Sequence, residues 1–173
     1  MITLDDVRTA RQRITGRVKR TQKLGLMRLG SFLRHHRRIA LDTSVFIYHI
    51  EANSRYVGCT DRIFAWLEQA GHSAVTSTIT MTEFLVQPHR DSAEQRVNQF
   101  FALLATYPNL DWIAPDLEVA DSAASIRATH RLRTPDALQA ATALRARATA
   151  LVTNDPVFER VDGFETLLLD HVL

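Results

Sequence analysis

Short apolar runs of strand length alternate with helical segments from residue 38 onward, and this alternation constrains the fold more than any other feature. The runs are rich in β-branched residues and span 38–41, 73–76, 110–114, 150–153 and 166–169. The segments between them predict helices near 44–50, 61–69, 80–86, 97–104, 117–130 and 136–148. Strands that alternate with helices pair in parallel and are covered on both faces. The sequence therefore predicts an α/β fold with a central parallel sheet of about five strands.

Composition and length indicate one soluble domain. The 173 residues can bury one core, and 46% hydrophobic with 23% charged residues is ordinary for a globular protein. No apolar run reaches the roughly 20 residues of a membrane span, and the first residues contain no apolar signal segment. The single cysteine, Cys59, fits a reducing cytoplasm and is expected to be a small buried hydrophobe.

The charge of the chain is strongly uneven. Residues 1–38 hold eleven Lys and Arg against two Asp, whereas residues 39–173 hold ten Arg, no Lys and seventeen acidic residues. We expect residues 1–36 to be a basic leader, helical or disordered, and residues 37–173 to be the domain. An acidic domain does not suit a protein that coats nucleic acid in general, but it does suit a site where carboxylates hold divalent cations.

Four acidic residues are expected at one edge of this sheet. Asp42 follows the first strand and Asp155 follows the fourth. Glu83 lies in the helix after the second strand, and Asp136 opens an alanine-rich helix. Ligand sites of parallel sheets open at the carboxyl ends of the strands, so all four carboxylates can face one edge.

Each acid taken alone also has a purely structural explanation. Asp42 can be the N-cap of the next helix, and Thr80 with Glu83 has the spacing of a capping box. Asp136 lies in the first turn of its helix, where the dipole favours an acid, and Asp155 precedes a proline in a turn. Four independent caps nevertheless have no reason to converge on one edge.

A metal site that cleaves phosphodiesters does require this convergence. Mg²⁺ or Mn²⁺ binds through a few carboxylates and waters, and the ion activates a water and neutralises the leaving oxygen. Carboxylates this close repel one another without a cation. The pattern therefore predicts a metal cofactor and raised carboxyl pKa values in its absence.

Four segments resemble the motifs of PIN domains: residues 39–45 (IALDTSV), 82–85 (TEFL), 134–141 (TPDALQAA) and 153–155 (TND). Among PIN domains they are most similar to the VapC-type toxins of toxin–antitoxin pairs. The resemblance covers about residues 37–173, and four motifs in order make it specific. It implies an α/β/α sandwich, Mg²⁺ or Mn²⁺ dependence and endonucleolytic cutting of RNA. It also implies a homodimer that is neutralised by a small antitoxin reaching into the active site.

The resemblance also implies roles for particular residues. Asp42, Glu83, Asp136 and Asp155 would form the catalytic metal cluster. Thr43 and Thr153 would be accessory polar groups that support it.

A cluster of cationic residues precedes the third motif and has two explanations. The residues can contact phosphate at the mouth of the site, or they can be a solvated helix end where cations suit the dipole. Arg133 is the best functional candidate because it is nearest in sequence to Asp136; the others are Arg127, His130 and Arg131.

Several origins are open for the leader. Its first residues resemble the opening of pyridoxal-phosphate threonine dehydratases, but the cofactor lysine of those enzymes has no counterpart, so no such chemistry is inferred. The leader is a fused remnant, an over-long start with Met27 as an internal start, or a basic arm that holds RNA by charge.

Other function classes with an acid after a strand fit less well. A receiver domain needs a lysine near its phosphorylated Asp, and residues 39–173 contain none. A haloacid-dehalogenase-like phosphatase needs a second Asp two residues after Asp42, where Ser44 stands, and it needs a lysine as well. The alternative left open is a catalytically inactive PIN-like module that binds RNA or a protein. Metal-dependent turnover of RNA separates that module from an enzyme.

Overall fold

The computed structural model describes residues 24–173, and its centre is a five-stranded sheet. All neighbouring strands are parallel and follow the order β3-β2-β1-β4-β5. The bounds are Arg38–Leu41 for β1, Ser73–Ser77 for β2, Leu110–Ile113 for β3, Ala150–Thr153 for β4 and Glu165–Leu168 for β5. Each strand lies within one residue of its predicted position, so the predicted parallel α/β fold is confirmed.

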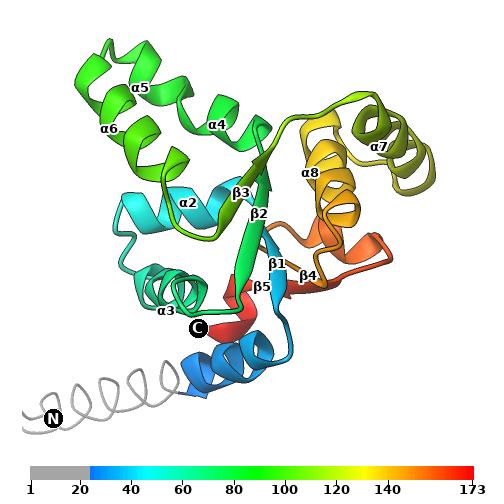
Figure 1. The fold of residues 1–173 in the computed structure, drawn as a ribbon, viewed down its shortest axis with the longest axis horizontal. Coiled ribbons are helices and arrows are strands. Elements are labelled where there is room, and N and C mark those ends of the chain that lie inside the picture. The colour runs from blue at the N-terminus through cyan, green and yellow to red at the C-terminus, as the bar shows by residue number, and fades with distance from the viewer. Residues whose placement is uncertain (1–23) are drawn as a thin grey trace, which may run out of the picture.

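Helices cover both faces of the sheet, which makes an α/β/α sandwich (Figure 1). On one side lie α2 (Thr43–Ile50) and α3 (Val57–Leu67); on the other lie α7 (Leu117–His130) and α8 (Thr134–Arg145). The remaining elements are α4 (Ile79–Phe84), α5 (Val86–Arg90), α6 (Glu94–Ala105), η1 (Pro156–Arg160) and η2 (Leu169–Val172). Within residues 24–173, no helix combines the length and apolar character needed to cross a bilayer.

Alternation along the strands divides the core into two clusters. In β1, Ile39 and Leu41 face one cluster and Ala40 faces the other. In β4, Val152 faces the same cluster as Ile39, and Leu151 faces the same cluster as Ala40. Because successive strand residues point to opposite faces, one short apolar run supplies both cores.

The predicted helix over residues 80–86 is divided in the structure. Helix α4 ends at Phe84 and α5 begins at Val86. Pro88 has no backbone N–H and cannot donate to the carbonyl of Phe84, so a continuous helix would lose that bond. The predicted helix over 136–148 ends at Arg145, because Arg147 adopts a left-handed backbone with φ 56°.

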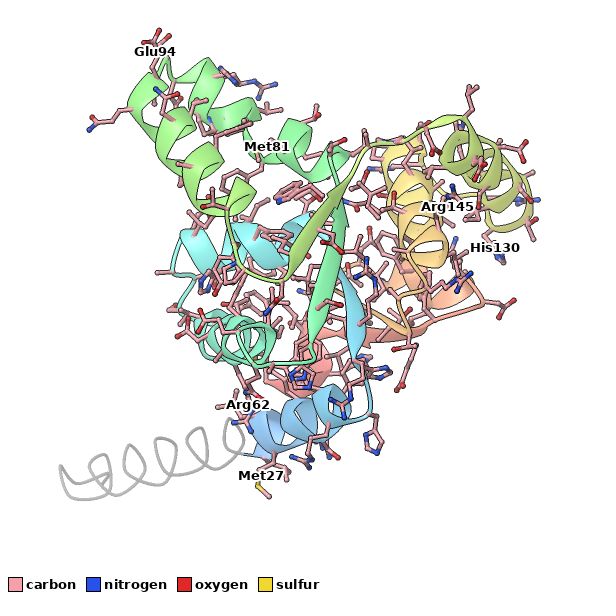
Figure 2. The ribbon with its side chains drawn as sticks, viewed as in Figure 1. Met27, Arg62, Met81, Glu94, His130 and Arg145 are labelled. Atoms are coloured by element: carbon pink, nitrogen blue, oxygen red, sulfur yellow. The ribbon has the colours of Figure 1, made fainter. Side chains whose placement is uncertain are left out.

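The packed structure begins before the expected domain boundary at residue 37. Residues 24–34 form a helix, and its Leu29 and Leu33 are fully buried in the same core as β1. Figure 2 shows the Arg62 side chain beside this helix, while Met27 lies on its outer side. His36 is also buried, and its Nδ1 lies 2.9 Å from the Thr149 hydroxyl. Residues 24–36 therefore contribute to the fold, and the expectation for residues 1–23 lies outside the described part of the chain.

Candidate active site at the carboxyl edge of the sheet

The four predicted acids line one open pocket of about 490 Å³: Asp42, Glu83, Asp136 and Asp155. They come from four separate elements. Asp42 directly follows β1, and Asp155 lies two residues beyond β4. Glu83 comes from α4, and Asp136 lies in the first turn of α8. The convergence predicted from parallel strands is thus present in the structure.

Two hydroxyl groups hold the carboxylate of Asp42. Ser44 Oγ and Thr153 Oγ1 both donate to Asp42 Oδ2, each at 2.8 Å. Asp42 occupies the N-cap position of α2, but its side chain makes no capping hydrogen bond. The capping explanation therefore does not account for this carboxylate, which two residues orient within the pocket.

Glu83 is held by a hydroxyl in the same manner. Thr43 Oγ1 donates to Glu83 Oε2 at 2.6 Å. The alternative capping box is wrong, because α4 begins at Ile79 and its N-cap, Thr78, makes no side-chain capping bond. Thr80 lies inside the helix, where its hydroxyl takes part in a buried polar network.

Gln139 of α8 organises that buried network. Its Nε2 donates to Thr80 Oγ1 at 2.5 Å and approaches Thr43 Oγ1 at 3.3 Å, while its Oε1 accepts from Ser77 N at 3.3 Å. A hydroxyl has one proton to donate and lone pairs that accept. Thr43 Oγ1 donates its proton to Glu83 while its lone pair accepts from the amide of Gln139. The network links α8, β2 and α4 beneath the carboxylates.

The sequence predicts no role for Ser44 or Gln139, and for Thr80 it offers only the capping box. For Gln139 a signal existed, because it lies three residues after Asp136 on the same face of an alanine-rich helix. A buried amide at such a place needs partners. Those partners lie in other elements, so the sequence alone could not name them.

Asp136 shows the electrostatic strain expected of clustered acids. Burial raises the pKa of its carboxyl, and the negative charges of Asp155 and Asp42 raise it further. The backbone and the guanidinium of Arg133 oppose that rise in pKa. Arg133 occupies the N-cap position of α8, and Asp136 lies in the first turn of that helix, as expected from the sequence.

Asp155 both caps a helix and lines the pocket. Its Oδ1 accepts from Val157 N at 2.9 Å and caps η1. Its own backbone N–H donates to Thr153 Oγ1 at 3.0 Å. Thr153 thus connects the backbone of Asp155 with the carboxylate of Asp42.

The cationic residues before α8 divide between the two explanations. Arg127 Nε donates to the carbonyl of Leu132 at 3.4 Å, and Arg131 caps α7 with a left-handed backbone, φ 59°. Both therefore serve the end of the helix. Arg133 is close enough to Asp136 for its charge to lower the pKa of that carboxyl.

The donor set fits a hard divalent cation. The pocket offers carboxylate and hydroxyl oxygens, which suit Mg²⁺ and Mn²⁺. In the described part of the chain, no three His, Cys, Asp or Glu side chains lie close enough to bind one ion together. Mg²⁺ usually binds one or two carboxylates and keeps several waters, so a closed ligand cage is not required. A cation would also offset the repulsion that raises the pKa of Asp136.

The family model of the PIN domain matches residues 39–164. This match spans most of the chain and contains all four acids, and the chain belongs to the PIN domain family. No curated protein sequence gives a significant match.

Solved structures with a similar fold come from bacterial protein complexes. A chain of VapBC2 from Rickettsia felis, bound to a promoter DNA fragment, has a TM-score of 0.59 at 16% identity. The matched region covers 76% of the present chain and 98% of the VapBC2 chain. FitAcB from Neisseria gonorrhoeae gives 0.58 at 23% identity, with 77% and 99% covered. DNA-bound VapBC from Salmonella typhimurium gives 0.57 at 19% identity, with 76% and 98% covered. At these identities the likeness establishes the fold.

Proposed function

We propose that this chain is a Mg²⁺- or Mn²⁺-dependent endoribonuclease and the toxin of a toxin–antitoxin pair. One observation carries the proposal: four acids from four elements line the same pocket at the carboxyl edge of the sheet. Nothing in helix capping requires Asp42 and Glu83 there, since neither carboxylate caps its helix. A cation site for a phosphodiester does require them.

The residues divide into those that hold the cation and those that hold the carboxylates. Four acids would bind the ion directly or through water: Asp42, Glu83, Asp136 and Asp155. The bound ion would lower the pKa of a water molecule and polarise the phosphate. Thr153 would fix Asp42 and Thr43 would fix Glu83 through the hydroxyl bonds described above. Arg133 would contact an RNA phosphate beside Asp136.

The toxin part of the proposal concerns partners. A "Toxin-antitoxin complex from Klebsiella pneumoniae" has a similar fold, with a TM-score of 0.56 at 20% identity. We propose a cytoplasmic homodimer controlled by an antitoxin that inserts a cationic segment into the acidic pocket. A short reading frame beside the gene should encode that protein. Its co-expression should suppress RNA cleavage, and a neighbouring product that neither binds nor inhibits would count against the pairing.

Isosteric amides at the acidic cluster test the nuclease. Asp42→Asn, Glu83→Gln and Asp136→Asn should each abolish cleavage of single-stranded RNA while the thermal unfolding temperature stays nearly unchanged. Asp155→Asn should reduce cleavage less if that residue acts through water. Asp162→Asn is the matched control, because this exposed acid lies on the loop leading into β5, at the other edge of the sheet. Wild-type activity in purified Asp42→Asn would show that the acidic cluster is not the catalytic site.

Metal dependence separates the enzyme from an inactive binding module. Cleavage should need Mg²⁺ or Mn²⁺ and stop in excess chelator, and Ca²⁺ should support little turnover because its coordination is loose. Undiminished cleavage in chelator would indicate a metal-free mechanism. RNA or protein binding without turnover in either metal would favour the inactive module.

A further inference from the structure

Tyr48 of α2 lines the acidic pocket although the proposed chemistry does not use it. The ring is half-buried, and Ile47 and Pro156 line the same pocket with it. The pocket therefore has an aromatic and apolar part beside its carboxylates. Part of the Tyr48 ring packs against the aromatic core cluster, and the part left uncovered lines this pocket.

The Tyr48 ring is supported by a second tyrosine. It stacks on Tyr56, with 4.1 Å between the ring centroids and 14° between the planes. Tyr56 therefore covers one face of the Tyr48 ring, and Tyr56 is itself nearly fully buried. Tyr48 is thus held in one orientation beside the pocket.

Tyr56 is itself fixed by polar contacts. Its hydroxyl donates to Asp170 Oδ1 at 3.0 Å and accepts from Asn154 Nδ2 at 3.1 Å. The Arg55 guanidinium lies over the ring, 5.3 Å from its centroid, and pairs with Asp170 at 2.9 Å. These contacts fix Tyr56, and Tyr56 in turn supports the Tyr48 ring beside the pocket.

A flat ring beside a phosphate site suits a nucleobase. A strand whose phosphate reaches the carboxylates must place a base within one nucleotide of that phosphate. Bases stack on aromatic side chains whatever their sequence, and unpaired bases can be splayed out to do so. We propose that Tyr48 is a positioning residue that stacks on a base of single-stranded RNA next to the scissile phosphate. This inference rests on the proposed nuclease function.

Kinetics of three variants test the stacking. On a short single-stranded RNA of mixed sequence, Tyr48→Leu should raise KM by on the order of tenfold and change kcat much less. Tyr48→Phe keeps the ring and should restore the wild-type KM. Tyr107→Leu is the matched control, because Tyr107 precedes β3 at the other edge of the sheet, packed against Phe64. Its KM should equal that of the wild type.

An abasic substrate tests the same contact without changing the protein. Once the cut is mapped, a ribose without its base replaces each nucleotide that flanks the cleaved phosphate. Wild-type protein should show a KM raised by on the order of tenfold at one of the two positions. Tyr48→Leu should cleave the abasic and the normal RNA with equal KM, because the stacking partner is already gone.

The outcomes separate this inference from the nuclease itself. If wild-type protein cleaves RNA, but neither abasic substrate raises its KM, the stacking proposal is overturned and the nuclease stands. A Tyr48→Leu variant that remains as sensitive to the missing base as the wild type has the same meaning. Absence of cleavage by wild-type protein with Mg²⁺ and with Mn²⁺ would overturn both.

Discussion

The two faces of the sheet are packed by different kinds of side chain. The face under α2, α3 and the helix of residues 24–34 is filled by large rings and leucines, among them Phe46, Phe64 and Trp66. The face under α7 and α8 is dominated by alanines, including Ala137, Ala140 and Ala141. Figure 1 shows the two helical layers on opposite sides of the same strands.

The difference explains where the pocket can form. Small residues let a helix approach the sheet closely, and α8 carries both Asp136 and Gln139. Gln139 reaches the backbone of β2 from there, and Asp136 comes close enough to Asp42 and Asp155 for their charges to raise its pKa. On the face under α2 and α3, large side chains provide packing stability. On the face under α7 and α8, small side chains let α8 lie close to the sheet.

The largest expected effect on stability lies on the aromatic face. Phe46→Ala removes a fully buried ring that contacts Phe64 and Trp112, with centroids 5.9 Å away in each case. The cavity should lower the free energy of unfolding by about 3–5 kcal/mol. Urea denaturation measures this. A loss below about 1 kcal/mol would mean that this face is not the main source of stability.

Overpacking on the alanine face should cost less stability but damage the site. Ala140→Leu inserts a large side chain at a fully buried position of α8. We expect a loss of about 1–3 kcal/mol and a displaced helix. RNA cleavage should fall even where the protein stays folded, because Asp136 and Gln139 would move with α8. Ala124→Leu on the exposed side of α7 is the control and should retain activity. Full activity in folded Ala140→Leu would show that the small side chains of α8 do not set the geometry of the acidic pocket.

Two glycines test whether the helix of residues 24–34 belongs to the aromatic face. A Cβ at Gly25 would collide with the backbone carbonyl of Val172, which cannot turn aside as a side chain can. Gly25→Ala should therefore destabilise by about 1–3 kcal/mol. Gly58 in α3 has nothing within 4 Å of a Cβ, so Gly58→Ala should stabilise by up to about 1 kcal/mol. If Gly25→Ala and Gly58→Ala had the same midpoint of thermal unfolding, the helix of residues 24–34 would not unfold together with the rest of the domain.

The smallest effect concerns the charge of Asp136 on the alanine face. Its pKa is higher in the folded protein than in the unfolded chain, so stability is greatest below the unfolded pKa and falls as pH rises through the folded value. In chelator, Asp136→Asn should therefore unfold at a higher temperature than the wild type near neutral pH. The difference should vanish below the ordinary carboxyl pKa. An advantage that grows toward acid pH would contradict the assigned cause.

Local patterns in the sequence determined the framework of this protein. β-Branched runs specified all five strands within a residue, because a buried strand needs little beyond its own apolar side chains. Once the strands were parallel, their carboxyl ends had to share an edge, which brought Asp42 and Asp155 together. Glu83, in the helix after the second strand, and Asp136, at the start of its helix, could face the same edge, and the family motifs then gave all four acids a common role.

How the carboxylates are held and where packing begins depend on contacts between elements that are distant in the sequence. The bonds from Gln139 to Thr80 and from Thr43 to Glu83 join residues far apart in sequence, and no local spacing encodes them. Leu29 and Leu33 occur in a strongly basic segment that composition assigns to a leader, yet they are fully buried. Burial depends on whether another element covers a side chain. A helix that packs with two leucines keeps its charges on the solvent side, so net charge alone could not exclude it from the core.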